Sequence, residues 1–503
     1  MSASTYELGR LHGGLRLDSL KEQSTSHSIY EMPVPARLVL PISQHVGSAA
    51  RPIVGIGEQV LKGQRIAETG GTLGAPVHAS SSGRVVAIEP WPVSRRYGDA
   101  APCIVIECDG EDRSIEDADA LPAYRDTAPE ALLTKILQGG IVGLGGAVFP
   151  TAQKLAQALA GELQYLILNG VECEPYISCD DLLMRERARQ VVGGAQILMH
   201  ALSLDVAYLV VESDKPDAIR RLGEALAELE DNRLVLIQVP TVYPSGGEDQ
   251  LVQLVTNREV PTGGLPSDVG CLVQNVATAA AIYDWIIGHE PLISRITTVT
   301  GDGIVRPMNV MARLGTTVAE VVAFAGGYTD RAELLIIGGP MTGKSMTTDR
   351  VPVVKATNCI LALSEPPKQG RARACIRCGE CAVVCPVRLL PQQLYWYACA
   401  DDEAKMRLHG LTDCIECGCC DLVCPSHIRL TADFRKAKAR IRELEDEKAR
   451  ADRARRRFEA RSERLDKEQR ARERQLLAQK ETARRAGPDA IAEILRRKQK
   501  DEE

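Results

Sequence analysis

The chain of 503 residues has a formal net charge of -6, and 45% of its residues are hydrophobic. This length predicts several domains, and this composition is sufficient for ordinary apolar cores. The beginning of the sequence lacks the apolar stretch of a signal peptide, and no apolar run is long enough to cross a bilayer. We therefore expect a soluble or peripheral protein.

Residues 31–112, which follow an N-terminal segment at 1–30, are predicted to form short strands broken by glycine. Their pattern G-x-x-V-x-x-G-x-x-I, followed by A-P-V-H-A-x-x-S-G-x-V, resembles the barrel-sandwich hybrid of lipoyl and biotinyl domains. Those carrier domains need a modifiable lysine at a hairpin tip, and the corresponding stretch here, GGTLGAP, has none. We therefore predict a docking module instead of a swinging arm.

Residues 129–290 alternate between strand-like and helical patterns. The strand-like runs are at 165–169, 206–212 and 233–240, and the helical patterns are at 185–203, 217–230 and 273–288. Such alternation predicts a central α/β domain with a mainly parallel sheet covered by helices.

Two loops of this domain carry residues suited to ligand binding. In GLGGAVFPTAQKL, residues 143–155, glycines let backbone amides approach a phosphate or a planar ring, and Pro150 suits the start of a helix. In NGVECEPYISCDD, residues 169–181, acidic and amide side chains follow a strand, where open α/β sheets bind ligands. A glycine turn and surface acids are the simpler alternative, which loses ground because both loops occur together.

Residues 291–362 return to strand-like patterns, which we interpret as a small soluble-ligand-binding β-grasp domain, and residues 364–374 are expected to form a linker. Within 363–431 the spacing C-x2-C-x2-C-x3-C-P occurs twice, as in bacterial ferredoxins. In two-cluster ferredoxins the fourth cysteine ligates the other cluster. We therefore predict an α-helical ferredoxin-like domain with two 4Fe–4S clusters. Their ligands would be Cys375, Cys378, Cys381 and Cys424 for one, and Cys414, Cys417, Cys420 and Cys385 for the other.

A pair of zinc sites is the alternative for these eight cysteines. Zinc ligands usually come as CxxC or Cys/His pairs, not as triplets with this spacing, so clusters are favoured. Because iron–sulfur assembly needs reduced thiols, the motifs also favour the cytosol over a disulfide framework.

Residues 432–503 form a charged tail with 24 Lys and Arg against 17 Asp and Glu. An apolar residue recurs every seven positions from Ala437 to Leu465, which predicts a long helix that ends at Gly487-Pro488. The basic charge suits an anionic membrane face or an acidic partner, and a solvated helix is the alternative. The tail lacks interleaved aromatic residues, so no nucleic-acid partner is expected.

The two loops together resemble those of the flavin-binding subunit of respiratory NADH:quinone oxidoreductase, which read G-R-G-G-A-G-F-P-T and N-A-D-E-x-E-P-G. The domain order is more similar to that of the RnfC family, whose members are subunits of Rnf (Rsx) ion-translocating electron-transport complexes. In this order a lysine-free hybrid domain comes first and two clusters come last. This resemblance covers about residues 1–431. It implies FMN and two 4Fe–4S clusters as cofactors and NADH as a substrate.

The resemblance also implies roles residue by residue. The residues that would hold the phosphate and ribityl oxygens of FMN are Gly143, Gly145, Gly146 and Lys154. Asn169 and Glu172 would contact the flavin, and Glu174 and Phe149 would face the nicotinamide dinucleotide. The family's G-E-E loop and N-N-V-E-T helix start correspond to Gly247, Glu248, Asp249, Gln274, Asn275 and Thr278. The chain departs from the pattern at three positions, with Leu144 for an arginine, Val148 for a glycine and Val171 for an acidic residue.

The implied function is a peripheral electron-transfer subunit at the cytoplasmic face of a bacterial inner membrane. It would pass electrons between NADH, through FMN, and ferredoxin-linked partners, together with the membrane subunits of an Rnf-type complex. No catalytic acid–base residues are expected, because the cofactors carry the chemistry. Two alternatives stay open: a soluble flavo-iron–sulfur cobalamin reductase, and a scaffold or redox sensor that keeps the clusters without flavin.

Overall fold

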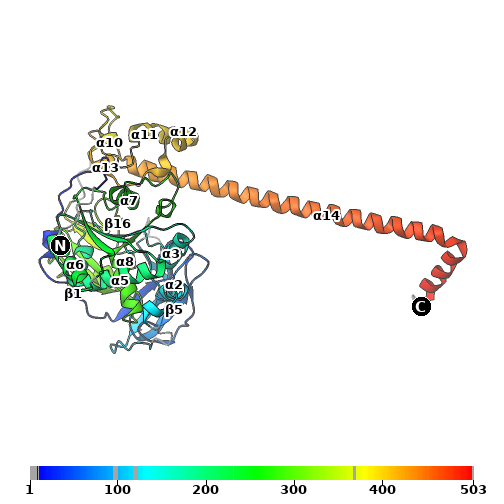
Figure 1. Cartoon of the computed structure of the whole chain (residues 1–503), viewed down its shortest axis with the longest axis horizontal. Coiled ribbons are helices and arrows are strands. Elements are labelled where there is room, and N and C mark those ends of the chain that lie inside the picture. Colours follow the sequence, from blue (N-terminus) through cyan, green and yellow to red (C-terminus); the bar gives the residue numbers. More distant parts are fainter. Residues whose placement is uncertain are drawn as a thin grey trace. The chain divides into compact units, whose positions relative to one another are not determined.

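The computed structural model describes residues 8–9, 11–94, 100–116, 123–229, 231–365 and 370–500 (Figure 1). The chain divides into two compact units, residues 1–434 and 435–503, and each is described by itself. Some pieces of the predicted segments lie outside the described residues: 1–7 and 10 of the N-terminal segment, 95–99 of the hybrid module, 230 of the α/β domain, 366–369 of the linker and 501–503 of the tail.

Two small antiparallel sheets form the module predicted as a barrel-sandwich hybrid. Their strand orders are β2-β8-β7-β4 and β3-β5-β6. The bounds are β2 (Arg37–Pro41), β3 (Arg51–Pro52), β4 (Gln59–Val60), β5 (Arg65–Glu68), β6 (Val77–His78), β7 (Gly83–Pro92) and β8 (Ala100–Cys108). In β2, Leu38 belongs to one apolar cluster, together with its neighbour Ile106 on β8, and Val39 belongs to another cluster. Strand β2 is therefore buried on both sides.

A four-stranded parallel sheet lies at the centre of the predicted α/β domain. Its order is β11-β10-β9-β12, with β9 (Tyr165–Gly170), β10 (Ala207–Glu212), β11 (Leu234–Val239) and β12 (Cys271–Asn275). The three predicted strands are confirmed. The helix expected from residue 273 is wrong at its start, because 273–275 belong to β12. A short apolar run buried in a parallel sheet has no period that separates a strand from a helix.

Helices pack around this sheet and close its core. Their bounds are α2 (Pro129–Gln138), α3 (Thr151–Leu159), α4 (Cys179–Glu186), α5 (Ala188–Leu202), α6 (Pro216–Leu229), α7 (Glu248–Thr256) and α8 (Val276–Ile286). Short 3-10 helices are η2 (Tyr124–Asp126), η3 (Pro266–Val269) and η4 (Leu411–Asp413). Helix α5 approaches α8 closely because Gly194 has no side chain; a Cβ there would lie 1.9 Å from the Ala279 carbonyl oxygen.

A six-stranded mixed sheet, in the order β1-β14-β13-β17-β15-β16, occupies the predicted β-grasp segment. The bounds are β1 (Tyr30–Glu31), β13 (Ser294–Thr300), β14 (Met308–Arg313), β15 (Leu334–Ile337), β16 (Lys344–Met346) and β17 (Cys359–Leu363). Helix α9 (Val318–Phe324) begins with a capping box of Thr317 and Glu320. Strand β1 pairs in parallel with β14, so the N-terminal segment supplies an edge of this sheet.

The N-terminal residues 8–31, of which residue 10 lies outside the described part, are called the strap. The amide of Gly9 donates to the Leu254 carbonyl on α7 (2.7 Å), and the amide of Gly14 donates to the Val384 carbonyl (2.9 Å). Leu15 and Tyr243 exchange two backbone hydrogen bonds of 2.7 and 2.8 Å. The strap continues through α1 (Glu22–Thr25) into β1, and so it connects the α/β domain, the cysteine segment and the six-stranded sheet.

The two cysteine runs fold alike. Each enters a short helix through a left-handed glycine, Gly379 before α10 (φ 85°) and Gly418 before α13 (φ 79°). Matched residues after the runs, Arg388 and His427, both have φ of 54°. The helices of this segment are α10 (Glu380–Val383), α11 (Pro391–Cys399), α12 (Glu403–Leu408) and α13 (Cys419–Leu422). The helical character predicted for the segment is thereby confirmed.

The tail is the long helix α14 (Leu430–Lys500). The predicted end at Gly487-Pro488 is confirmed, because α14 consists of two helices that meet at a kink there. Gly487 leaves the helical conformation (φ 71°, ψ 170°), and a helix resumes behind it. A proline fits the first turn of a helix, so Pro488 starts the second piece as readily as it would end the first. Among the described residues, no helix combines the length and the apolar character needed to span a membrane.

Candidate functional site

A cavity of about 370 Å³ lies at the carboxyl ends of strands β9 and β12. Asn169, near the end of β9, and Asn275, which ends β12, are paired neighbours in the sheet, and both line the cavity. The strand order reverses between them, because β9 continues to β10 on one side while β12 is added on the other. Open α/β sheets bind ligands at such switch points.

The cavity gathers more than half of the residues predicted to bind FMN or the dinucleotide. Eight of them line it: Gly145, Asn169, Glu172, Glu174, Gly247, Glu248, Asp249 and Asn275. Six others are not among its lining residues: Gly143, Gly146, Phe149, Lys154, Gln274 and Thr278. Cys417 of the second cysteine run also lines the cavity. The predicted ligand loops and one predicted cluster ligand therefore share a wall.

The first glycine loop is closed by its own backbone. The amide of Gly143 donates to the Phe149 carbonyl (2.8 Å), and the amide of Leu144 donates to Oγ1 of Thr278 on α8 (2.9 Å). A Cβ at Gly146 would meet no atom within 4 Å, so this part of the loop has open space beside it. Val148 lies in the left-handed region with φ of 46°, which is a strained conformation for a β-branched residue.

Lys154, on α3, bridges two other elements. Its Nζ donates to the Glu248 carboxylate (2.6 Å) at the start of α7 and to the Val273 carbonyl (2.7 Å) on β12. The ammonium group therefore has an anionic partner, and it joins the glycine loop to the G-E-D loop.

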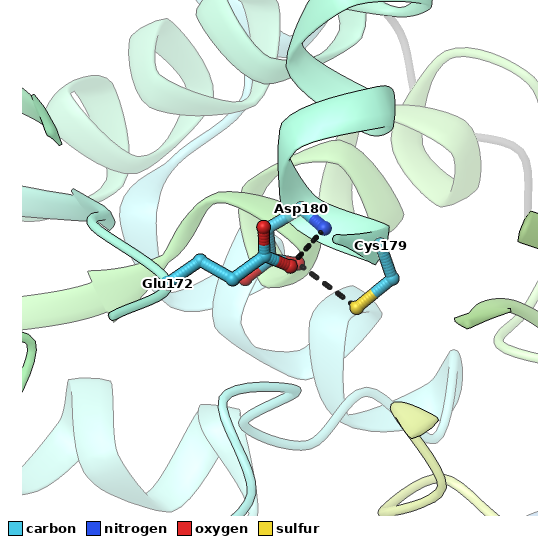
Figure 2. A group of neighbouring side chains, drawn as sticks. All are labelled: Glu172, Cys179 and Asp180. Atoms are coloured by element: carbon cyan, nitrogen blue, oxygen red, sulfur yellow. Dashed lines mark hydrogen bonds between the residues drawn. The ribbon is translucent and has the colours of Figure 1, made fainter. Parts of the chain in front are cut away.

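Glu172 reaches the beginning of α4, as Figure 2 shows. Its carboxylate accepts hydrogen bonds from the amides of Asp180 (2.7 Å) and Asp181 (3.1 Å), and Nδ2 of Asn275 donates to the Asp180 carboxylate (2.6 Å). Ligand atoms of Glu172, Cys179 and Asp180 lie within 4.8 Å of one another. Protein donors bind both carboxylates, so we assign this group to the cavity wall instead of to a metal.

Burial sets the electrostatics of this wall. It raises the pKa of the Glu172 carboxyl to about 8, and it also raises the pKa of Asp180. Glu172 therefore carries less negative charge near neutral pH than an exposed carboxyl does.

Glu174 ties the cavity to the six-stranded sheet. Its carboxylate accepts hydrogen bonds from the amides of Met341 (2.9 Å) and Thr342 (2.8 Å) and from the Thr342 hydroxyl (2.7 Å). These donors belong to the turn between β15 and β16, so Glu174 helps to place that turn beside the cavity.

The cysteines of the two runs meet across the runs. Four of them line one small cavity, namely Cys375, Cys378, Cys381 and Cys424. This is the set predicted for one cluster, with its fourth member from the second run. Two members of the other predicted set also lie near each other across the runs. Val384, which precedes Cys385, shares an apolar cluster with Cys417 and with the buried Cys419.

Three family models match the chain. They are the Nuo51 FMN-binding domain over residues 136–284, the RnfC barrel sandwich hybrid domain over 9–111 and the SLBB domain over 296–345. Among similar proteins, the RnfC protein of the ion-translocating oxidoreductase complex of Citrobacter koseri is 43% identical over 491 residues, which cover 96% of this chain and 68% of that protein. This chain belongs to the RnfC family of ion-translocating oxidoreductase complexes.

Other members of the family are similarly close. The RnfC proteins of Pseudomonas aeruginosa and Klebsiella pneumoniae are 50% and 44% identical, each over 92% of this chain. The chain spans 60% and 61% of the length of those two relatives. A crystal structure of an NAD+-reducing NiFe-hydrogenase is similar with a TM-score of 0.43 and 19% identity, over 63% of each chain, a likeness too distant to carry an argument.

Within this member of the RnfC family, two of the three departures from the flavin pattern are buried. Val171 is fully buried in an apolar cluster, and Leu144 lines the cavity while 4% exposed. Apolar packing thus replaces the acidic residue and the arginine at these positions.

Sequence reasoning missed three residues of the cavity region. Tyr243 lines the cavity, and its hydroxyl donates to the Cys417 carbonyl (2.7 Å). Lys21 of the strap donates from Nζ to the Glu172 carbonyl, and buried Lys215 pairs with Glu212 (2.8 Å). None of the three belongs to a local pattern, so only the folded chain reveals their neighbours.

Proposed function

We propose that this chain is the FMN-binding and cluster-binding electron-transfer subunit of an ion-translocating oxidoreductase complex. In this role it is peripheral at the cytoplasmic membrane face, bound to the membrane subunits of an Rnf-type complex, and it transfers electrons between NADH and ferredoxin-linked partners. The observation that carries the proposal is the shared wall. One cavity is lined by Asn169, Glu172 and Asn275 and also by Cys417.

The residues around the cavity fit FMN. A Cβ at Gly145 would lie 3.4 Å from Cβ of Asn275, so the glycine keeps a gap that a side chain would fill. When bound, FMN supplies the exchange between two-electron and one-electron transfer, and clusters carry single electrons.

The chain's own residues would divide the work of binding. The phosphate and ribityl oxygens of FMN would be held by the loop of Gly143, Gly145 and Gly146, in which the Gly143 amide already donates to the Phe149 carbonyl, and by Lys154. Asn169 and Glu172 would contact the flavin, and Glu174 and Phe149 would face the dinucleotide. The remaining contacts are assigned to Gly247, Glu248, Asp249, Gln274, Asn275 and Thr278.

The sulfur spacing supports clusters over zinc. Zinc–sulfur bonds of about 2.3 Å in a tetrahedral site place sulfur atoms roughly 3.8 Å apart. Among the described residues, no three of the motif cysteines bring their Sγ atoms within 4.8 Å of one another. The motif spacing predicts a larger inorganic core than a single zinc ion.

The decisive experiment is anaerobic purification of the full chain after reconstitution with iron, sulfide and FMN. We expect about one FMN and roughly eight irons per chain, as two four-iron clusters require, and rapid bleaching of both chromophores by NADH. Two four-iron clusters without any flavin would leave the scaffold alternative in place.

Gly145→Leu, which fills the gap beside Asn275, is expected to abolish FMN binding while the iron content stays unchanged. Gly223→Leu is the matched control, because a Cβ at Gly223 meets no atom within 4 Å. Equal FMN binding by the two variants would contradict the assignment of the cavity.

A further inference from the structure

The strap brings a buried lysine to the back of the cavity. Lys21 is 7% exposed, and its Nζ donates to the main-chain carbonyl of Glu172, a cavity-lining residue. Contacts on both sides hold this piece of the strap in place. The amide of Tyr176 donates to the Ser19 carbonyl (2.8 Å), and the hydroxyls of Ser24 and Ser178 lie 2.8 Å apart.

The contact with Lys21 falls on an unfavourable backbone conformation. Glu172 has φ of 51°, in the left-handed region that disfavours residues other than glycine. Such conformations persist where the surroundings hold them, and they gather at functional sites. The Lys21 ammonium fixes the carbonyl of that residue, so it helps to orient the turn that aims the Glu172 carboxylate at α4.

Lys21 differs from the other buried lysine of this region in how its charge is compensated. Lys215 forms ion pairs with Glu212 (2.8 Å) and Asp214 (3.1 Å). Lys21 forms no ion pair with a described side chain. Its charge acts from further away: it lowers the pKa of Glu172 and of Asp180, against the larger rise that burial causes. A buried ammonium group whose hydrogen-bond partner is a neutral carbonyl is costly, and a negative group bound in the cavity would offset part of that cost.

We propose that Lys21 is a positioning residue of the cofactor cavity, which holds the Glu172 turn and favours the more negative, reduced form of the bound cofactor. This inference rests on the proposed function, namely that the cavity binds FMN. The strap is then part of the redox site, and the potential of the flavin depends on a residue far from both flavin loops in the sequence.

The test uses the full chain, reconstituted with FMN and clusters, in four variants. Lys21→Met removes the charge and the donor, Lys21→Gln removes the charge and keeps a donor, and Lys21→Arg keeps both. Ser24→Ala loosens the same strap without changing any charge. The measurements are the flavin midpoint potential by spectroelectrochemistry, the FMN dissociation constant in both redox states and the iron content.

We expect Lys21→Met and Lys21→Gln to weaken the binding of reduced FMN about tenfold more than that of oxidised FMN, which lowers the two-electron potential by about 30 mV. Lys21→Arg should retain most of the wild-type potential, and Ser24→Ala should retain all of it.

Distinct results overturn the two levels of the proposal. If the wild-type chain binds no FMN, the proposed function itself fails. If it binds FMN but both uncharged variants keep the wild-type potential, the inference about Lys21 fails alone. A similar drop in Ser24→Ala would show that loosening the strap, and not the charge, changes the potential. Should Lys21→Met lose its iron, the comparison of Lys21→Gln with Lys21→Arg decides the outcome.

Discussion

Glu172 shows at the residue scale how much of the site a local motif can locate. Its carboxylate caps α4 and its carbonyl receives Lys21. The loop N-G-V-E-C-E is contiguous in the sequence, so it indicated Glu172 directly. Lys21 lies 151 residues away in a segment without periodicity, and no spacing rule connects the two. Residues that act within one loop could be predicted, while their partners from distant segments could not.

The crossed cysteine sets give the first prediction. Because Cys375 and Cys424 line the same small cavity, Cys375→Ser and Cys424→Ser should each disrupt one and the same cluster. The double variant should therefore lose no more iron than either single variant, about four atoms of roughly eight. Iron analysis together with electron paramagnetic resonance of the reduced protein measures this.

The control pairs cysteines of different predicted sets. Cys375→Ser with Cys414→Ser should remove both clusters. Cys399→Ser, at an exposed cysteine outside both runs, should keep them. Additive iron loss in the Cys375 and Cys424 pair would contradict the crossed assignment.

Val148 gives a second prediction at this scale. Its left-handed conformation costs about 1–2 kcal/mol for a residue with a Cβ, and glycine relieves that strain. The relief offsets the lost apolar contact and the added chain entropy, so Val148→Gly should change the free energy of unfolding by less than about 1 kcal/mol. Val235→Gly, in strand β11 and also half-buried, should destabilise by about 2–3 kcal/mol. Urea denaturation of both apo-variants measures the difference, and equal losses would refute it.

At the scale of elements, the confirmed predictions are those of segments in which the spacing of apolar residues was clear. Strands β9, β10 and β11 stood out as apolar runs flanked by helical patterns. Strand β12 was hidden, because it ends at Asn275 and α8 begins at the next residue, so that no turn separates the two apolar runs. The strap was also hidden, since its order comes from partners such as Leu254 and Val384 and not from its own pattern. Elements with a periodic face could be predicted, and elements held by distant backbone groups could not.

Gly13 gives a prediction for the strap as an element. A Cβ on Gly13 would lie 2.7 Å from the Val384 carbonyl oxygen and 2.8 Å from the carbonyl carbon of Cys385, a predicted cluster ligand. Gly13→Ala should therefore displace the ligand loop and speed iron release to a chelator.

Gly57→Ala is the matched control for Gly13→Ala. Both glycines have positive φ, so both variants bear a strain of about 1–2 kcal/mol, but a Cβ on Gly57 meets nothing within 4 Å. Gly57→Ala should release iron at the wild-type rate. Identical release from the two variants would show that the strap does not position the ligand loop.

At the scale of the unit formed by residues 1–434, Lys355 lies where three domains meet. Its Nζ donates to the Pro76 carbonyl of the hybrid module (3.1 Å) and to the Gly140 carbonyl of the α/β domain (2.7 Å), and its own segment connects β16 to β17. The sequence indicated the three domains through their separate patterns. It did not indicate this junction, because a single lysine before a strand has no signature of burial.

Lys355 also gives a prediction about pH. Burial lowers the pKa of its ammonium group to about 7, from about 10.4 in an unfolded chain. Between about pH 7 and pH 10 the unfolded chain therefore binds more protons than the folded one, and this group makes stability rise with pH. In that window the free energy of unfolding of the wild-type chain should rise with pH by up to about 1.4 kcal/mol per pH unit more than that of Lys355→Met. Urea midpoints at several pH values measure the gain, and parallel profiles of the two proteins would exclude it.

The strap also constrains the order of events during synthesis. Gly14 leaves the ribosome 370 residues before Val384, its hydrogen-bond partner. At 5–20 residues per second, the nascent strap waits roughly 20 to 75 s for that partner. The part of the strap at Gly14 therefore docks on the first cysteine run only after synthesis has passed Val384, whereas the contacts around Lys21 need only residues up to 178. Stalled chains that end before residue 370 should be cleaved by protease next to Gly14 faster than the full chain.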